Sequence, residues 1–372
     1  MRRRAVLICL DGCAPEYIQR SAVPNIRRLA KEGFSTLSGL AMVPTVTNVN
    51  NVSLITGAYP QEHGITSNCY YDRARGEEVY MESSSSITAP TIFEELAQRG
   101  KTSALLSAKD KLCSLLNKGP QIVFSAENPP DWIVKEIGKP PSIYSIDVNP
   151  WLLKALRVVL DKNDPDLIYV GTTDYVGHKY APDEDEAQRH MALVDEEIGL
   201  LSERLSDGLI CISADHGMLA KTRAVNLRAA MEMAGVNSWV IPTVKDKYVV
   251  HHSNLSGSAY VYLIGQNANK VHDVLNIFAD IEGVERALTA EEAAREYHLP
   301  ASRLGDILVL GDKDTVFGEA SEEVVADVAI RSHGSLNERD VPLIVQRSDS
   351  EATGPVENKD MARVVLSHLL QG

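Results

Sequence analysis

The amino-acid sequence predicts an α/β fold in which helices flank a mostly parallel sheet and a smaller α+β block is inserted. Three observations support this fold class. Short apolar segments alternate along the chain with segments of helical periodicity, which is typical of a parallel sheet covered by helices. The 372 residues exceed what one ordinary hydrophobic core fills. Between residues 226 and 326, neighbouring strand patterns replace the alternation.

Five segments are expected to form strands of the main sheet. Each is a short, mostly apolar run bounded by polar or turn-forming residues. They are Ala5–Leu10, Thr102–Ser107, Asp166–Gly171, Leu209–Ala214 and Val341–Gln346.

Four further segments are expected to form helices that cover this sheet. Pro24–Glu32 begins with a proline in its first turn, and Thr91–Arg99 begins with a Thr-x-x-Glu capping box. Glu184–Leu205 carries one apolar stripe, and Lys359–Leu370 has the pattern of a closing surface helix.

Residues 226–326 are expected to form an inserted α+β cap domain, so that residues 1–225 and 327–372 make up the main domain. An irregular, proline-rich excursion is expected near residues 115–140. Within the insert, three strands are expected at Trp239–Val244, Tyr248–His252 and Ser258–Ile264. Two helices are expected to follow, at Lys270–Ile281 and Ala290–Tyr297.

Charge and apolar content exclude several classes of partner. With 37 basic and 51 acidic residues, the formal net charge is −14, which disfavours binding to nucleic-acid phosphates. No segment approaches the ~20 apolar residues that span a bilayer, so no membrane association is expected. The apolar run Ala5–Leu10 is shorter than the apolar segment of a signal peptide, about 7–15 residues. The five scattered cysteines argue against a disulfide framework, and a cytoplasmic location is expected.

Carboxylate and imidazole side chains follow the carboxyl ends of three expected strands, and one more histidine precedes the last strand. In open parallel sheets ligands bind beyond these strand ends, so the side chains can converge. Such donors suit zinc or a similar divalent ion, and their number exceeds one tetrahedral shell, which predicts two metals. Taken alone, each of these side chains also has a structural explanation; Asp11, for example, could cap the turn that follows its strand. The residues are Asp11, Asp174, His178, Asp215, His216 and His333.

A polar segment ending in a helical run contains a candidate nucleophile. Thr47 precedes the run Asn50–Thr56 and would lie at a helix N-terminus, where free amides and the helix dipole favour a phosphoryl oxyanion. A threonine hydroxyl needs a metal or base to become nucleophilic. The structural alternative is that Thr45 and Thr47 only cap the helix.

Several motifs occur in one order along the chain and together resemble the alkaline phosphatase superfamily, in its nucleotide pyrophosphatase/phosphodiesterase branch. The resemblance covers everything except the inserted block. Its motifs are Leu10-Asp11-Gly12, Pro44–Thr47, Gly57–Ile65 with Asn68, Asp174 with His178, Ala214–Gly217 and Ser332–Gly334. Within that branch the segments Thr47–Asn51 and Ala108–Leu112 are most similar to the phosphonoacetate hydrolase family.

The resemblance implies an alkaline phosphatase-like core, two Zn²⁺ ions and a role for each site residue. One zinc would be held by Asp174, His178 and His333, and the other would be surrounded by Asp11, Thr47, Asp215 and His216. Asn68 would bind a phosphoryl oxygen, and Lys109 and Lys111 would receive the substrate carboxylate. The implied reaction cleaves the carbon–phosphorus bond of phosphonoacetate, through a phosphothreonine at Thr47, to acetate and phosphate.

Other functions stay open at this point. A phosphodiesterase, nucleotide pyrophosphatase or phosphomonoesterase would use the same metals with a different substrate pocket. A non-catalytic metal- or phosphate-binding protein is a further alternative. Lys109 and Lys111 are also compatible with a solvated helix start. The expected partner is a small anionic phosphonate or phosphate; a homodimer is compatible with the sequence, and the role of His251-His252 is left open.

Overall fold

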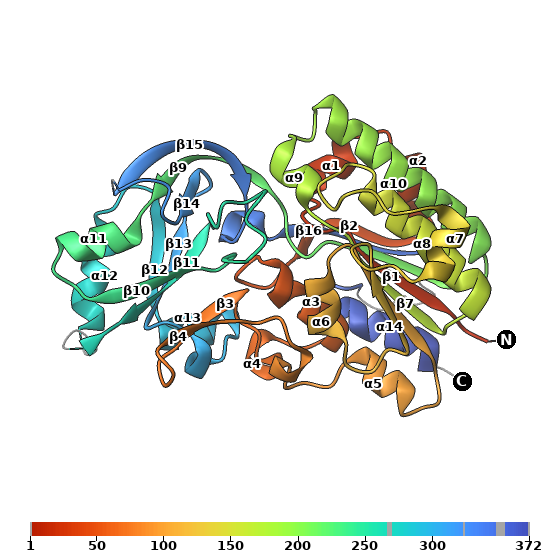
Figure 1. The fold of residues 1–372 in the computed structure, drawn as a ribbon, viewed down its shortest axis with the longest axis horizontal. Coiled ribbons are helices and arrows are strands. Elements are labelled where there is room, and N and C mark those ends of the chain that lie inside the picture. Colours follow the sequence, from red (N-terminus) through yellow and green to blue (C-terminus); the bar gives the residue numbers. More distant parts are fainter. Residues whose placement is uncertain (1, 266–269, 323, 347–353, 371–372) are drawn as a thin grey trace.

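The computed structural model describes residues 2–265, 270–322, 324–346 and 354–370. A seven-stranded sheet forms the larger half of the molecule (Figure 1). β1 lies parallel between β7 and β8, and β5 lies parallel between β7 and β6, whereas β16 is antiparallel to both of its neighbours. The mostly parallel sheet is therefore confirmed. Its strands, in spatial order, are β2 (Gly33–Leu40), β16 (Asp340–Gln346), β8 (Leu209–Ser213), β1 (Ala5–Cys9), β7 (Leu167–Gly171), β5 (Ser103–Ser107) and β6 (Ile122–Ser125).

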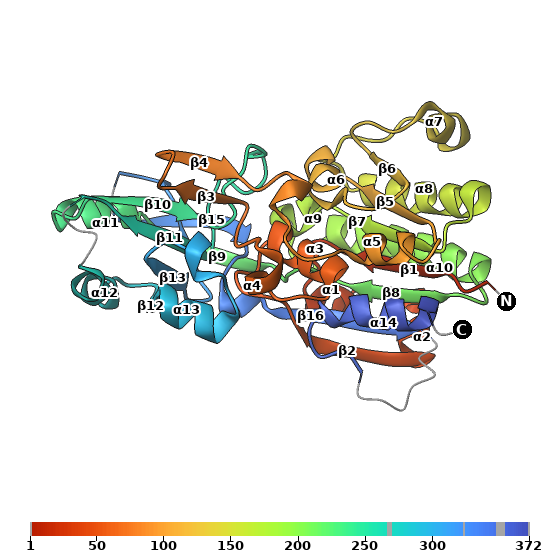
Figure 2. The ribbon, with the colours of Figure 1, turned by 90° about the horizontal axis from the view of Figure 1, so that it is seen from below.

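The central strands are buried on both faces because helices cover both, as expected for parallel strands. One face carries α1 (Pro15–Arg20), α2 (Pro24–Lys31), α8 (Val148–Asn163) and α10 (Asp185–Arg204) (Figures 1 and 2). The other carries α3 (Thr47–Thr56), α5 (Ile92–Ala97) and α14 (Asp360–Leu370), with α6 (Asp110–Leu116) nearby. The four predicted helices are confirmed, including the capping box of α5. The short helix α4 (Pro60–His63) follows α3, and the short helix α9 (Tyr175–Lys179) follows β7.

The expected irregular excursion at residues 115–140 is more ordered than its prolines suggested. It contains the edge strand β6 and helix α7 (Asp131–Ile137). The prolines lie between the elements: Pro120 precedes β6, and Pro130 is the N-cap of α7, a place where the missing N–H breaks no helical bond.

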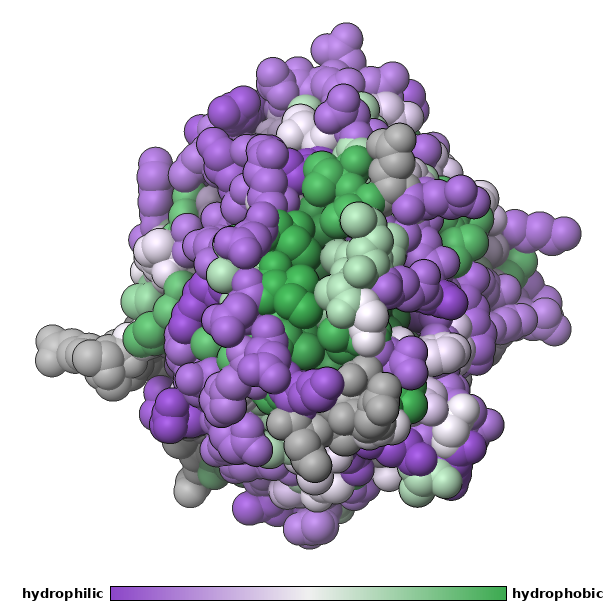
Figure 3. Space-filling model, turned by 90° about the vertical axis from the view of Figure 1, so that its left-hand side faces the viewer, coloured by the Kyte–Doolittle hydropathy of each residue, from purple (hydrophilic) through white to green (hydrophobic). Residues whose placement is uncertain are grey.

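The remaining strands form three smaller sheets, two of them at the far end of the molecule from α8 and α10 (Figure 1). An antiparallel sheet contains β10 (Ser238–Pro242), β11 (Ser258–Leu263), β13 (Ile307–Gly311) and β12 (Val284–Thr289); a second contains β14 (Thr315–Phe317), β9 (Leu219–Val225) and β15 (Val325–Ser332). Helices α11 (Leu227–Met233), α12 (Val271–Ala279) and α13 (Ala290–Tyr297) pack with them. The hairpin of β3 (Cys69–Asp72) and β4 (Glu77–Tyr80) joins this end through Tyr71, which stacks on Trp239 with ring centroids 5.3 Å apart. This end also exposes an apolar patch within a hydrophilic border (Figure 3).

Within residues 226–326, two of the three expected strands and both helices are confirmed. The expected strand Tyr248–His252 is wrong, because these residues form a turn. Asp246 accepts backbone N–H groups at the start of this turn, and Ser253 and Asn254 have φ angles of 51° and 55°, which no strand allows. The domain limits at residues 226 and 326 stay a prediction; β15 runs across the second of them.

No helix in the described ranges combines the length and apolar character needed to cross a membrane.

Candidate metal centre and active site

The carboxyl ends of three adjacent central strands place three aspartates at one edge of the sheet. Asp11 follows β1, Asp174 follows β7 and Asp215 follows β8. All three side chains are buried. The three aspartates thus lie together beyond the carboxyl ends of parallel strands, as expected from the sequence.

Three histidines face these carboxylates. His216 Nε2 lies 3.4 Å from an oxygen of Asp11 and 3.7 Å from one of Asp215. His178 Nε2 lies 3.0 Å and His333 Nε2 3.7 Å from Asp174 Oδ2. The rings of His216 and His333 stack with centroids 3.6 Å apart. The structure therefore brings all six predicted ligands together.

The hydrogen bonds of the three histidine Nδ1 atoms determine whether each Nε2 atom carries a proton or a lone pair. The Nδ1 atoms of His178, His216 and His333 lie 2.7, 2.9 and 2.7 Å from the backbone carbonyl oxygens of Arg331, Gly217 and Thr45. A carbonyl oxygen only accepts, so each Nδ1 carries the proton, and in a neutral ring each Nε2 presents a lone pair. These lone pairs point at carboxylate oxygens, which are acceptors too. Such an arrangement calls for cations between the two sets of atoms.

The charges of the carboxylates lead to the same conclusion. Burial, together with the charges of Asp174 and Asp215, raises the pKa of Asp11 well above its usual value, and Asp11 Oδ1 has no hydrogen-bond partner. Asp174 is held ionised: burial opposes this, but the charge of the neighbouring Lys109 ammonium keeps its pKa well below the usual range. An orphaned carboxylate oxygen beside two further buried carboxylates fits a metal cluster, and oxygen and imidazole donors suit zinc.

The nucleophile candidate lies where the sequence placed it. Thr47 is the first residue of α3, and its Oγ1 is 3.3 Å from His216 Nε2. Neither Thr47 nor Thr45 caps α3: no side chain caps this helix, and the Thr45 hydroxyl instead donates to the carbonyl of Ser335. Asn51 fixes the segment to the sheet edge, because its Nδ2 donates to the Thr47 carbonyl and to Asp215 Oδ2, both at 3.0 Å.

The two lysines are buried rather than solvated, each about 8% exposed. Lys109 is the N-cap residue of α6, and its Nζ lies 3.2 Å from Asp174 Oδ1. Lys111, in the first turn of α6, contacts the carboxylate of Asp246. The alternative of a solvated helix start is therefore wrong. A cavity of about 470 Å³ is lined in part by Lys111 and Tyr248.

Asn68 is buried just before β3. Its Nδ2 donates to the carbonyl of Val244 at 3.2 Å, and its Oδ1 has no partner. One N–H of the amide stays available, and its role toward a phosphoryl oxygen stays a prediction.

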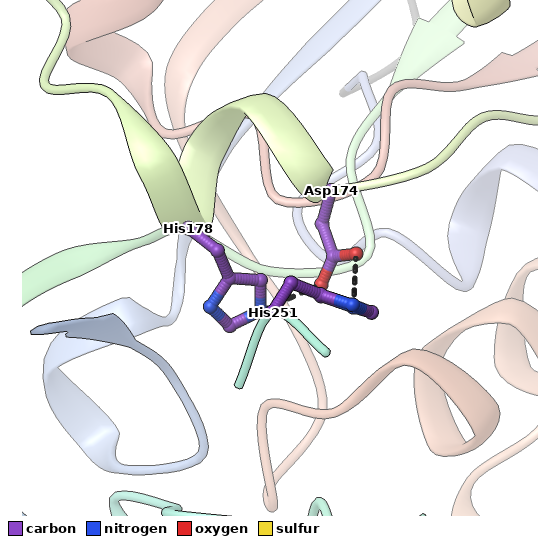
Figure 4. A group of neighbouring side chains, drawn as sticks. All are labelled: Asp174, His178 and His251. Atoms are coloured by element: carbon purple, nitrogen blue, oxygen red, sulfur yellow. Dashed lines mark hydrogen bonds and ion pairs between the residues drawn. The ribbon is translucent and has the colours of Figure 1, made fainter. Parts of the chain in front are cut away.

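Two site residues were not found from the sequence. His251 Nε2 lies 3.4 Å from Asp174 Oδ1, and Figure 4 shows His178 and His251 both directed at the Asp174 carboxylate. Asp246 pairs with Lys111. The only sequence signal was the neighbouring pair His251-His252, since neither His251 nor Asp246 follows a strand of the main sheet.

Comparison with known proteins gives a family and a structural relative. The family model for type I phosphodiesterase/nucleotide pyrophosphatase matches residues 5–336. An ectonucleotide pyrophosphatase/phosphodiesterase of Caenorhabditis elegans is 25% identical over 334 residues, 84% of this chain and 36% of that protein. A venom phosphodiesterase of Macrovipera lebetinus is 28% identical over 57% of this chain and 25% of its own length. The chain thus spans about a third or less of these relatives.

Among solved structures, phosphonoacetate hydrolase from Sinorhizobium meliloti 1021 in complex with phosphonoacetate superposes with a TM-score of 0.89 at 31% identity, over 99% of this chain and 96% of that one. Murine ectonucleotide pyrophosphatase/phosphodiesterase 5 in complex with AMP superposes with a TM-score of 0.72 over 99% of this chain and 95% of that one. Its identity is 16%, so this likeness shows a common fold alone.

Proposed function

The chain belongs to the type I phosphodiesterase/nucleotide pyrophosphatase family, and from this premise we propose that it is a two-zinc hydrolase that cleaves phosphonoacetate to acetate and phosphate. The observation that carries this choice of substrate is the pair of buried ammonium groups, Lys109 and Lys111, beside the aspartate–histidine cluster. They match a substrate that bears a carboxylate next to its phosphonate. The likeness to a phosphonoacetate hydrolase over 99% of the chain supports the same substrate.

The residues fit two zinc ions. One would be held by Asp174, His178 and His333, and the other by Asp11, Asp215 and His216 with the Thr47 hydroxyl. Bound zinc supplies positive charge that lowers the pKa of a hydroxyl and stabilises phosphoryl oxygens.

The protein's own residues then account for the reaction. The Thr47 hydroxyl gives up its proton to water, and its Oγ1 attacks phosphorus opposite the carbon. The phosphorus–carbon bond then breaks, and its electron pair passes to the acetate enolate. Lys109 and Lys111 bind the carboxylate of this leaving group and stabilise its growing charge, while the Asn68 amide donates to a phosphoryl oxygen. The enolate carbon takes a proton from water, and a second water hydrolyses the phosphothreonine, releasing phosphate and restoring Thr47.

A second candidate is a phosphodiesterase or nucleotide pyrophosphatase, the activities after which the curated relatives are named. A phosphomonoesterase would use the same cluster. Neither class of substrate needs a carboxylate site. A non-catalytic binding protein is disfavoured because the Thr47 hydroxyl lies beside the buried aspartate–histidine cluster, where a binding protein needs no nucleophile.

Phosphate release separates these activities. The zinc-loaded protein is assayed with phosphonoacetate, p-nitrophenyl phosphate and a nitrophenyl phosphodiester under one set of conditions. We expect the highest kcat/KM with phosphonoacetate. A higher value with the diester, or no release from phosphonoacetate, would reject the proposed substrate.

The proposal includes the cellular location of the protein and its partners. All five cysteines are free thiols in the structure and buried, which is compatible with the proposed cytoplasmic location. The proposed partner is the small anionic substrate, and we propose no binding to nucleic acid or to a membrane. The proposal is compatible with a homodimer.

A further inference from the structure

The carboxylate of Asp246 connects helix α6 to the turn of residues 246–254. Its Oδ2 contacts the Lys111 ammonium. Its Oδ1 accepts the backbone N–H groups of Lys247 at 2.6 Å and of Tyr248 at 3.3 Å. The N–H of Asp246 in turn donates to Asn254 Oδ1 at 2.9 Å, which closes the turn. Asp246 is 5% exposed, so these contacts are largely shielded from bulk water.

This turn connects β10 to β11 and reaches the aspartate–histidine cluster from their four-stranded sheet. Between its ends lies His251, whose Nε2 is 3.4 Å from Asp174 Oδ1. The next residue, His252, accepts the N–H of Asn254 at its Nδ1, 3.0 Å away. The position of the turn therefore decides where the His251 ring stands relative to Asp174.

Lys111 needs a counter-charge, since a buried, unpaired ammonium is strongly disfavoured. Asp246 provides it: burial opposes ionisation, but the nearby charges of Lys111 and Lys109 lower the pKa of this carboxyl. An ammonium has three N–H donors, so the contact with Asp246 leaves others for an incoming anion. Asp246 thus restricts where Lys111 points without using up its hydrogen-bonding capacity.

We propose that Asp246 is a positioning residue for substrate recognition: it aims the Lys111 ammonium at the substrate carboxylate and fastens the turn that carries His251 to α6. The identity of the substrate rests on the proposed function, whereas the link between α6 and the turn does not.

Asp246→Asn tests the first half of this proposal. The amide oxygen can still accept the N–H groups of the turn, but an amide nitrogen beside the ammonium abolishes the ion pair. We expect KM for phosphonoacetate to rise about tenfold with a smaller change in kcat. The ratio of kcat/KM for phosphonoacetate to that for p-nitrophenyl phosphate should fall about tenfold, and Asp246→Glu should restore part of it.

Glu82→Gln is the matched control, because it also removes one carboxylate charge near the turn but pairs with Lys247 rather than Lys111. It should leave the substrate ratio at its original value. A lower KM in Asp246→Asn would mean that Asp246 competes with the substrate for Lys111, and an equal loss on both substrates would mean a general structural role. Either result overturns the proposal.

Hydrogen–deuterium exchange of the metal-free protein tests the second half without any assay of activity. Asp246→Asn and Lys111→Met should each speed amide exchange within residues 246–254, whereas Glu82→Gln should not. Unchanged exchange in Lys111→Met would show that α6 does not hold the turn and would overturn this half. If the unaltered protein releases no phosphate from phosphonoacetate, the proposed function fails, and the exchange result still decides the link.

Discussion

At the scale of single residues, the position of Thr47 yields the sharpest prediction. Its hydroxyl lies 3.3 Å from His216 Nε2 and caps no helix, so its removal should leave the fold intact. We expect Thr47→Ala to lower kcat by at least about a hundredfold at an unchanged thermal midpoint and metal content. Thr47→Ser, which keeps a hydroxyl, should retain part of the activity. A near-normal rate in Thr47→Ala would indicate direct attack by water.

The two lysines should behave differently when replaced, although the sequence treats them alike. Lys111 touches Asp246, whereas Lys109 Nζ lies 3.2 Å from Asp174, a proposed zinc ligand. A charge-assisted hydrogen bond is worth ~1.5–3 kcal/mol, so Lys111→Ala should lower kcat/KM for phosphonoacetate about tenfold to a few hundredfold. The effect on p-nitrophenyl phosphate should be smaller. Lys109→Ala should reduce both, because it also disturbs Asp174; parallel kinetics on the two substrates check this difference.

At the scale of elements, a fully buried ion pair holds the loop that presents His333. Lys221 Nζ, on β9, lies 2.6 Å from Glu338 Oε1. Glu338 is the last residue of the short helix η4 (Leu336–Glu338), and its Oε2 accepts the backbone N–H of Ser335. Lys221→Met should lower the free energy of unfolding by about 3–5 kcal/mol, because Glu338 would stay buried without its partner. Urea denaturation measures this. Arg204→Met, which breaks the exposed pair with Asp161, is the control and should change stability little. Equal effects would contradict the argument.

The elements also show what could be predicted from the sequence. Asp11, Asp174 and Asp215 were placed correctly because parallel strands bring their carboxyl ends to one edge, whatever the loops do. The turn around His251 was mistaken for a strand because its shape depends on Asp246, which pairs with Lys111, 135 positions away in the chain. No local pattern carries that contact. Strands β9 and β15 escaped prediction because charged residues interrupt their apolar pattern, and β14 because it has only three residues.

At the scale of the whole molecule, the aspartate–histidine cluster should couple metal content to stability. Without metal, Asp11, Asp174 and Asp215 share a buried space and repel one another. We expect elemental analysis of dialysed protein to give two zinc ions per chain, and chelation to lower the thermal midpoint until zinc is restored. Fewer than one metal per chain in a fully active protein would reject the two-zinc site.

The order of strands in the main sheet has a consequence for how the chain matures. β16, which is late in the sequence, inserts between β2 and β8, and His333 precedes it by a few residues. During synthesis from the N-terminus, β1, β5, β7 and β8 therefore leave the ribosome well before the residues that complete their sheet and the aspartate–histidine cluster. Until then the growing chain exposes an unpaired edge of β8 beside uncompensated carboxylates. The nascent protein therefore depends longest on protection from aggregation along the unpaired side of β8, beside the strand end that carries Asp215.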